Sequence, residues 1–232
     1  MITKRPSAAR GHADHGWLDA YHSFSFAGYH DRAFMGFGDL RVLNHDTIAP
    51  ARGFGTHGHD NMEIVTYVIS GALEHKDSMG NGSRIEPGDV QLMSAGTGVT
   101  HSEFNPLQDQ STTLLQMWVL PAHRDTEPRY EEARFPLEER QGALRLVVSP
   151  DGRDGALTIG QDVQLYAGLL VEGEAAQLQI DPDRRAWLHV ARGALTLNGM
   201  DFGPGDGAGL IGESLLRFEG SDDAEFVLFD LP

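Results

Sequence analysis

Hydrophobic positions along this chain alternate with polar ones in short runs. Examples are MEIVTYVIS at 62–70, TLLQMWVLP at 113–121 and AEFVLFDLP at 224–232. Turn-forming residues interrupt the runs at short intervals, and the chain holds 28 glycines and 11 prolines. A period of two between such turns is typical of β-strands, and no strand-rich region carries a sustained 3.6-residue period. The pattern therefore predicts an all-β protein.

One charged segment, AHRDTEPRYEEARFPLEERQG at 122–142, breaks this rhythm. It is low in β-branched residues, so we expect a linker with one or two helical turns around 130–134. The chain then divides into an N-terminal domain (1–121), the linker (122–142) and a C-terminal domain (143–232). Each domain has the usual size of one sandwich or barrel.

The two halves resemble each other weakly. Residues 68–96 read VISGALEHKDSMGNGSRIEPGDVQLMSAG, and residues 190–212 read VARGALTLNGMDFGPGDGAGLIG. Both place Gly-Ala-Leu after an apolar run and Pro-Gly-Asp before the next, which indicates one β unit used twice. The second copy has lost the histidines of the first. Only His189 remains there, and a lone histidine on a strand is more often structural than a ligand.

Composition excludes several classes of function. The net charge is -16, from 34 acidic and 18 basic residues, and an acidic surface repels phosphate backbones, so we expect no direct nucleic-acid binding. There is no cysteine, which excludes thiolate chemistry and makes the cytoplasm the expected compartment. The start of the chain has no apolar core of a secretory signal. No apolar run approaches the roughly 18 residues of a membrane span, so no membrane association is expected.

The candidate metal-binding residues lie between Gly53 and Asn105. Alternate residues of a strand face the same way, so His57 and His59 can point at one spot, as can His101 and Glu103. If the strands carrying the pairs are adjacent, four ligands converge. Three imidazoles and a carboxylate suit one divalent metal ion such as iron, nickel, copper, manganese or zinc. On an octahedral metal, two positions then remain for a substrate or dioxygen.

Other side chains leave alternatives open. His-x-His alone is a weak pattern, and the surrounding glycines are what strengthen it. Glu63 could share the histidine face by parity. His75 stands near a predicted hairpin turn, so we expect it to be exposed. Four further histidines have spacings that fit no single strand face, so packing or a pocket wall is favoured over a second metal site: His12, His15, His22 and His30.

HGHDNMEIVTYVISG resembles the first cupin motif, and GDVQLMSAGTGVTHSEFN resembles the second. The second motif of this chain has a carboxylate, Glu103, two residues after His101. This differs from the general cupin motif and is similar to the motif of pirins. The likeness covers almost the whole chain. Further segments that carry the resemblance to pirins are GFGTHGH, HSEFNP, GWLDAYHSFSFAGY and MGFGDLRVLNHD.

The resemblance implies two tandem cupin (jelly-roll-like) β-barrels, with metal only in the N-terminal one. It implies a metal, usually iron, held by His57, His59, His101 and Glu103, with Glu63 outside the ligand set. It also implies a quercetin 2,3-dioxygenase, which cleaves a flavonol with O2 and releases CO. In that activity, Glu103 would act as the general base that accepts the flavonol hydroxyl proton.

Two alternatives remain from the sequence. Pirins are also linked to transcriptional co-regulation and redox sensing through protein partners, and the acidic charge does not speak against such a partner. The chain would then be a metal-containing binding protein rather than an enzyme. A bicupin acting as an isomerase or another oxygenase is the third interpretation.

Overall fold

The computed structural model describes residues 1–232, nearly all of them in β-strands and turns. The chain forms two compact units. We call the unit made of 11–134 and 157–161 the N-terminal barrel, and the remainder the C-terminal barrel. The predicted all-β class is confirmed. None of the helices has the length or the apolar composition needed to span a lipid bilayer.

The structure divides the chain differently from the expected ranges. Residues 1–10 belong to the C-terminal barrel, and the expected linker continues the N-terminal barrel as far as Arg134. The helical turns expected around 130–134 are wrong, because Arg129–Arg134 is a strand at the edge of a sheet. Its four charged side chains, Arg129, Glu131, Glu132 and Arg134, are exposed or half-buried, as is usual for an edge strand that must not pair with another chain.

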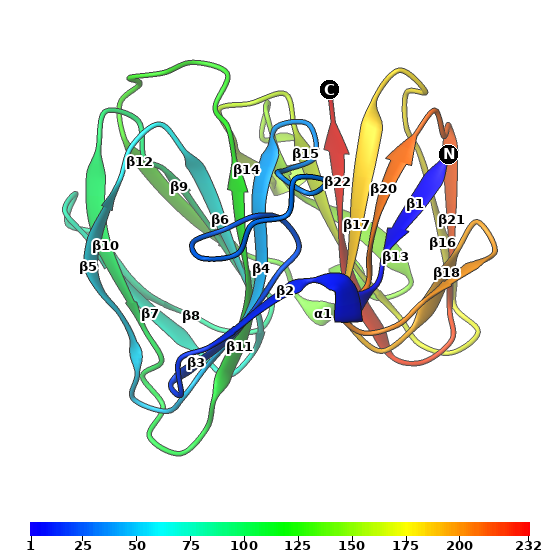
Figure 1. The fold of residues 1–232 in the computed structure, drawn as a ribbon. Coiled ribbons are helices and arrows are strands. Elements are labelled where there is room, and N and C mark those ends of the chain that lie inside the picture. Colours follow the sequence, from blue (N-terminus) through cyan, green and yellow to red (C-terminus); the bar gives the residue numbers. More distant parts are fainter. The chain divides into compact units, whose positions relative to one another are not determined.

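The N-terminal barrel consists of two antiparallel sheets (Figure 1). The larger sheet has the order β12-β9-β6-β11-β4-β3-β2, and the smaller has the order β5-β10-β7-β8. The strands of these two sheets are β2 (Gly11–Asp14), β3 (Leu18–His22), β4 (Leu40–Ile48), β5 (Gly53–His59), β6 (Glu63–Ser70), β7 (Leu73–Asp77), β8 (Gly82–Ile85), β9 (Asp89–Ser94), β10 (Val99–Phe104), β11 (Thr112–Val119) and β12 (Arg129–Arg134). The short strand β14 (Leu157–Thr158) belongs to this unit but to neither of its two sheets.

A polar row crosses the inner face of the larger sheet. Cross-strand pairing aligns five side chains from β3, β4, β11, β6 and β9. Apolar clusters flank the row on both sides, one containing Val68 and Leu114 and the other containing Ile64 and Met93. The barrel therefore carries polar chemistry between two apolar layers. The polar row consists of His22, Asn44, Gln116, Thr66 and Gln91.

The C-terminal barrel is filled by apolar side chains instead. One buried cluster includes Leu188, Phe218 and Phe226, whose last two rings stack at 5.1 Å. Its elements are β1 (Ile2–Arg5), η1 (Ser7–Ala9), α1 (Leu137–Arg140), β13 (Ala143–Ser149), η2 (Arg153–Gly155), β15 (Gln164–Leu170), β16 (Ala175–Gln179), β17 (Arg185–Arg192), β18 (Leu195–Leu197), β19 (Met200–Phe202), β20 (Gly207–Ile211), β21 (Leu215–Gly220) and β22 (Ala224–Leu231).

Candidate metal centre

The two predicted ligand pairs lie on adjacent strands. His57 and His59 are on β5, His101 and Glu103 are on β10, and His101 pairs directly with His57. The ring centroids of His57 and His101 are 4.4 Å apart, and those of His59 and His101 are 5.0 Å apart. Each of the three imidazoles offers a nitrogen, and these nitrogens lie within 4.8 Å of one another. The structure thus brings the three histidines together.

A bulge in β5 sets the orientation of the His57 ring. The register between β10 and β5 shifts by one residue, so that His101 opposes His57 while Glu103 opposes Phe54. The His57 Nδ1 lies 2.8 Å from the Gly55 carbonyl oxygen. A carbonyl only accepts, so Nδ1 carries the proton and Nε2 remains as the free nitrogen. Hydrogen bonds of this kind fix the tautomer of metal-binding histidines.

The histidine cluster is suited to a cation rather than to more protons. Burial lowers the pKa of His101 to about 3, with His57, His59 and His75 adding to the effect. Burial and His57 lower the pKa of His59 to about 4. Both ring nitrogens of buried His101 lack a hydrogen-bond partner. Neutral imidazoles with an unpartnered nitrogen are the donors that a divalent metal requires, so the residues fit one metal ion.

Glu103 is a buried carboxylate held by Gln116. The Gln116 side-chain amide donates to both Glu103 oxygens, at 3.1 and 3.0 Å, and its own oxygen accepts from Thr66 at 3.0 Å. Burial raises the Glu103 pKa, while the Gln116 hydrogen bonds and His57 oppose that rise. A carboxylate oxygen of Glu103 also lies within 4.8 Å of donor nitrogens on His101 and His75.

The expectation that His75 is exposed is wrong. Its ring is fully buried, 5.3 Å from the His101 ring and stacked on Tyr130 at 4.9 Å. Strand β7 places it beside β10, so it points into the barrel instead of the nearby turn. Both of its nitrogens have partners, Gln91 at 3.3 Å and Asp77 at 3.4 Å. His75 therefore supports the His101 ring, and its nitrogens are less available to a metal.

Glu63 is turned to other partners. Its carboxylate accepts from the Ser94 hydroxyl at 2.7 Å and from the Gly160 amide at 3.3 Å. It belongs to neither group of candidate metal ligands. The alternation of side chains along the strand would allow Glu63 to share the face of the histidines. These two hydrogen bonds instead hold its carboxylate away from them.

The remaining histidines form no further cluster of candidate ligands, and both groups found lie in the N-terminal barrel. His22 is buried, contacts Asn44 at 2.8 Å and lines the cavity, in line with the expected pocket wall. His12 pairs with Asp19 at the surface. His189 is buried on β17 of the C-terminal barrel.

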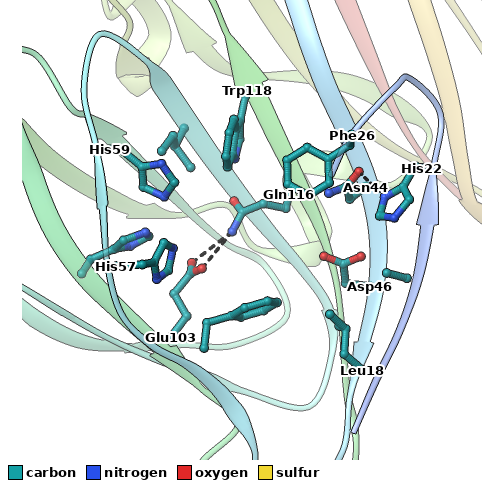
Figure 2. Close-up of a pocket in the computed structure, with 14 residues that line it drawn as sticks. Leu18, His22, Phe26, Asn44, Asp46, His57, His59, Glu103, Gln116 and Trp118 are labelled. Carbon is teal, nitrogen blue, oxygen red and sulfur yellow. Dashed lines mark hydrogen bonds between the residues drawn. The ribbon is translucent and has the colours of Figure 1, made fainter. Parts of the chain in front are cut away.

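A cavity of about 210 Å³ opens beside the histidines (Figure 2). His57, His59 and Glu103 lie on one side of it, and Asp46 lies on the opposite side. Most of its wall is apolar or aromatic, which favours a flat organic ligand. The lining residues are Leu18, Ala20, His22, Phe26, Asn44, Asp46, Phe54, His57, His59, Ile64, His101, Glu103, Gln116 and Trp118.

The sequence pattern did not single out three residues that lie beside the histidines or the cavity, namely Gln116, Asp46 and the buried His75. The first two stand at inward positions of alternating strands, where a polar residue among apolar ones is unusual. That break in the alternation is the signal that could have singled them out.

Two β-barrel units, of which one carries three convergent imidazoles and a buried carboxylate beside an aromatic cavity, define a bicupin metalloprotein. Comparison with known proteins agrees. Residues 3–119 match the Pirin family, and residues 146–231 match a family described as the quercetinase C-terminal cupin domain.

Relatives match over the full length. A quercetin 2,3-dioxygenase of Escherichia coli K12 is 47% identical over 232 residues, which cover 100% of this chain and 99% of the relative. A pirin-like protein of Caulobacter vibrioides is 41% identical, with 99% of each chain covered. The crystal structure of the bacterial pirin YhhW from Escherichia coli in complex with nickel(II) has a TM-score of 0.94 and 46% identity, with coverage of 100% and 99%. The chain belongs to the pirin family.

Proposed function

We propose that this protein is a metal-dependent quercetin 2,3-dioxygenase, an oxidoreductase that cleaves a flavonol with O2 and releases CO. The observation that carries the proposal is the cluster of His57, His59 and His101 with the buried Glu103, at one side of an aromatic-walled cavity. Full-length relatives at 47% identity that are named for this activity support it. The substrates are then a flat flavonol and dioxygen.

The ligand set we propose is His57, His59, His101 and Glu103, and the native metal we propose is iron. Imidazole and carboxylate donors suit iron, nickel and copper alike. A pirin 46% identical to this chain forms a complex with nickel(II), which supports one metal ion at this site and keeps nickel as the alternative to iron. A divalent ion held there supplies electrostatic stabilisation of a substrate oxyanion.

Glu103 is the proposed base for the flavonol 3-hydroxyl. Its carboxylate is buried and lines the cavity, so a hydroxyl of a ligand held next to the histidines lies within reach of it. Gln116 donates to both of its oxygens and keeps the carboxylate facing the cavity. Proton transfer from the hydroxyl to Glu103 leaves the electron-rich enolate that reaction with dioxygen requires.

The apolar walls restrict the substrate and exclude water. The Trp118 ring packs edge-on against His59 at 4.9 Å and against Phe26 at 5.3 Å. Phe54 lies 6.3 Å from His57 on the other side. Rings in these positions favour a planar aromatic molecule next to the histidines, and they keep bulk water from the reacting groups.

The test uses purified protein reloaded separately with iron, nickel, copper and manganese. The quercetin absorbance band is followed in air. Metal-dependent loss of the band is expected in the wild type and not in Glu103→Ala. Glu74→Ala on the neighbouring strand β7 is the matched control, since its side chain is partly exposed and pairs with Lys76. Stoichiometric metal without turnover for any ion would contradict the enzyme proposal and favour a regulatory metal protein.

The native metal is tested by elemental analysis of protein purified without added metal salts. Iron as the main ion is the expected result. A consistent excess of nickel, zinc, copper or manganese would overturn the assignment of iron and leave the ligand set unchanged.

A further inference from the structure

Asp46 is a buried carboxyl group in an apolar row of the N-terminal barrel. It lies on the inward face of β4 and is only 4% exposed. Its cross-strand neighbours are Ala20 on β3 and Leu114 on β11, and Leu114 in turn pairs with Val68. None of these side chains can hydrogen-bond. An ionisable group in such a row is unusual in a soluble barrel.

The Asp46 carboxyl differs from the polar row beside it. In that row, His22 contacts Asn44 at 2.8 Å, and Thr66 donates to Gln116 at 3.0 Å. The Oδ1 atom of Asp46, by contrast, is buried without a hydrogen-bond partner in the protein. A buried polar atom without a partner is costly. The fold therefore retains a group whose partner must come from outside the chain.

The cavity is the only place from which such a partner can reach Asp46, because its strand neighbours are packed apolar side chains. Figure 2 shows the Asp46 carboxyl group at the wall of the cavity opposite Glu103. A flat molecule that reaches the histidines with one end would present its other end to Asp46.

We propose that Asp46 forms a hydroxyl-binding subsite that recognises a ring hydroxyl of a planar polyphenol, remote from the oxygen that faces the histidines. This inference rests on the proposed function and names the substrate feature that the site selects. Asp46 is then a specificity-determining residue, and it does not act on the reacting atoms.

The protonation chemistry of Asp46 is compatible with this partner. Burial, with the charges of Glu103 and Asp19 adding to it, raises the Asp46 pKa to about 8. A protonated carboxyl offers one donor and one acceptor. A phenol hydroxyl offers the same two functions, so the pair can satisfy each other without placing a net charge in the apolar row. An anionic ligand group would instead face the negative Glu103 across the cavity.

The test compares two flavonols on metal-loaded protein under anaerobic conditions, where binding occurs without turnover. Quercetin carries ring hydroxyls remote from the 3-position, and 3-hydroxyflavone has none. Dissociation constants are measured from the flavonol absorbance and from quenching of tryptophan fluorescence. The wild type is expected to bind quercetin more tightly. Asp46→Leu is expected to weaken quercetin binding about tenfold or more and to change 3-hydroxyflavone binding less than about twofold.

Thr47→Val is the matched control, because Thr47 is the next residue of β4, points away from the cavity and contacts Thr113 on the outer face. It is expected to leave both constants unchanged. Equal weakening of both flavonols by Asp46→Leu would overturn the subsite. So would a wild type that binds 3-hydroxyflavone as tightly as quercetin, and that comparison needs no variant to fold.

The two proposals fail in different ways. If the wild type binds quercetin with the expected Asp46 dependence but does not consume it in air, the dioxygenase proposal fails and the subsite stands. If it turns quercetin over with no dependence on Asp46, the subsite fails alone. If it binds neither flavonol, both proposals are wrong.

Discussion

Gln116 is the residue that fixes the Glu103 carboxylate. Its amide nitrogen donates to both carboxylate oxygens, and Thr66 holds its amide oxygen. Replacement by Leu removes the donor while keeping the approximate volume. We expect Gln116→Leu to lower metal affinity or turnover about 10–100-fold, the usual effect of losing a hydrogen-bond partner of a metal ligand. Metal titration and steady-state rates measure the two effects.

The control for Gln116 is Thr66→Val, which removes only the bond that holds the amide oxygen. Its effect is expected to have the same sign and to be smaller, since the amide nitrogen still reaches Glu103. Gln116→Leu with wild-type metal affinity and turnover would show that Glu103 needs no such support.

Because the Asp46 carboxyl is buried, we expect it to make the stability of the protein depend on pH, and we expect a single substitution of Asp46 to remove that dependence. Its pKa is about 8 in the folded protein and near the ordinary value of 3.8 when unfolded. The folded state therefore binds the proton more tightly, and the Asp46 contribution to stability is full below about pH 4 and is lost as the pH rises through about 8. Asp46→Asn carries no proton to lose, so its stability relative to the wild type should rise with pH over this window.

Urea unfolding of metal-free protein at pH 5 and pH 7.5 measures this difference. We expect the Asn variant to gain on the order of 2 kcal/mol relative to wild type between the two pH values, below the linkage limit of about 1.4 kcal/mol per pH unit. A difference that stays constant with pH would mean that Asp46 titrates near its ordinary pKa.

At the residue scale, the sequence predicted those features that depend only on the alternation of side chains along a single strand. The spacing of His57 and His59, and of His101 and Glu103, places each pair on one strand face whatever the register. A break in the alternation marks Gln116 and Asp46 as unusual, but their place beside the cavity depends on the pairing of β3, β4 and β11, which leaves no local pattern. The exposed His75 was predicted from a turn that lies nearby in sequence, while β7 in fact faces it inward.

The pairing of β5 with β10 is the element on which the metal centre depends. A methyl group at Gly53 would overlap the Glu103 carbonyl oxygen and the Phe104 Cα, whereas one at Gly55 would meet no atom within 4 Å. Gly53→Ala is therefore expected to force the strands apart beside Glu103 and to weaken metal binding about tenfold or more. Gly55→Ala is the matched control on the same strand.

Metal titration and thermal unfolding of both glycine variants test this element. The expected order of metal affinity is wild type and Gly55→Ala together, followed by Gly53→Ala. Equal affinity for all three proteins would mean that the strands separate without moving Glu103. Backbone overlap is difficult to relieve, because neither partner atom is the end of a flexible side chain.

At the element scale, alternation predicted most strands, while the bulge in β5 was not predictable. A one-residue register shift leaves no mark on the hydrophobic pattern of its own strand. The charged residues of β12 were misjudged for a related reason. An edge strand exposes one side to solvent, so its composition resembles that of a linker.

At the scale of the whole molecule, the sequence indicated a repeat of two similar units, but it did not indicate that the first strand of the chain belongs to the C-terminal barrel. The repeated Gly-Ala-Leu and Pro-Gly-Asp segments predicted two similar units. Nothing local predicts that β1 pairs with β20, more than two hundred residues later, where Ile2 opposes Leu210. The bond from the Met1 amino group to Glu213 secures the same end of the chain.

Metal removal should lower the stability of the N-terminal barrel, because a metal that binds only the folded state stabilises it by mass action. At a free metal concentration about 1,000 times the dissociation constant, the gain is about 4 kcal/mol. For domains of 150–250 residues, 1 kcal/mol shifts Tm by about 2–4 °C. Chelation should therefore lower Tm by roughly 10 °C, and nickel or iron should restore it, as measured by differential scanning calorimetry.

The control for metal removal is the double variant His57→Ala, His101→Ala, whose Tm should not respond to nickel. The remaining histidines make this control necessary, since the chain holds 11 and several lie at the surface. If the double variant still gained about 10 °C on addition of nickel, the stabilising ion would bind elsewhere. The three imidazoles would then be a packed cluster, despite the unpartnered nitrogens of His101 and the lowered pKa values of His59 and His101.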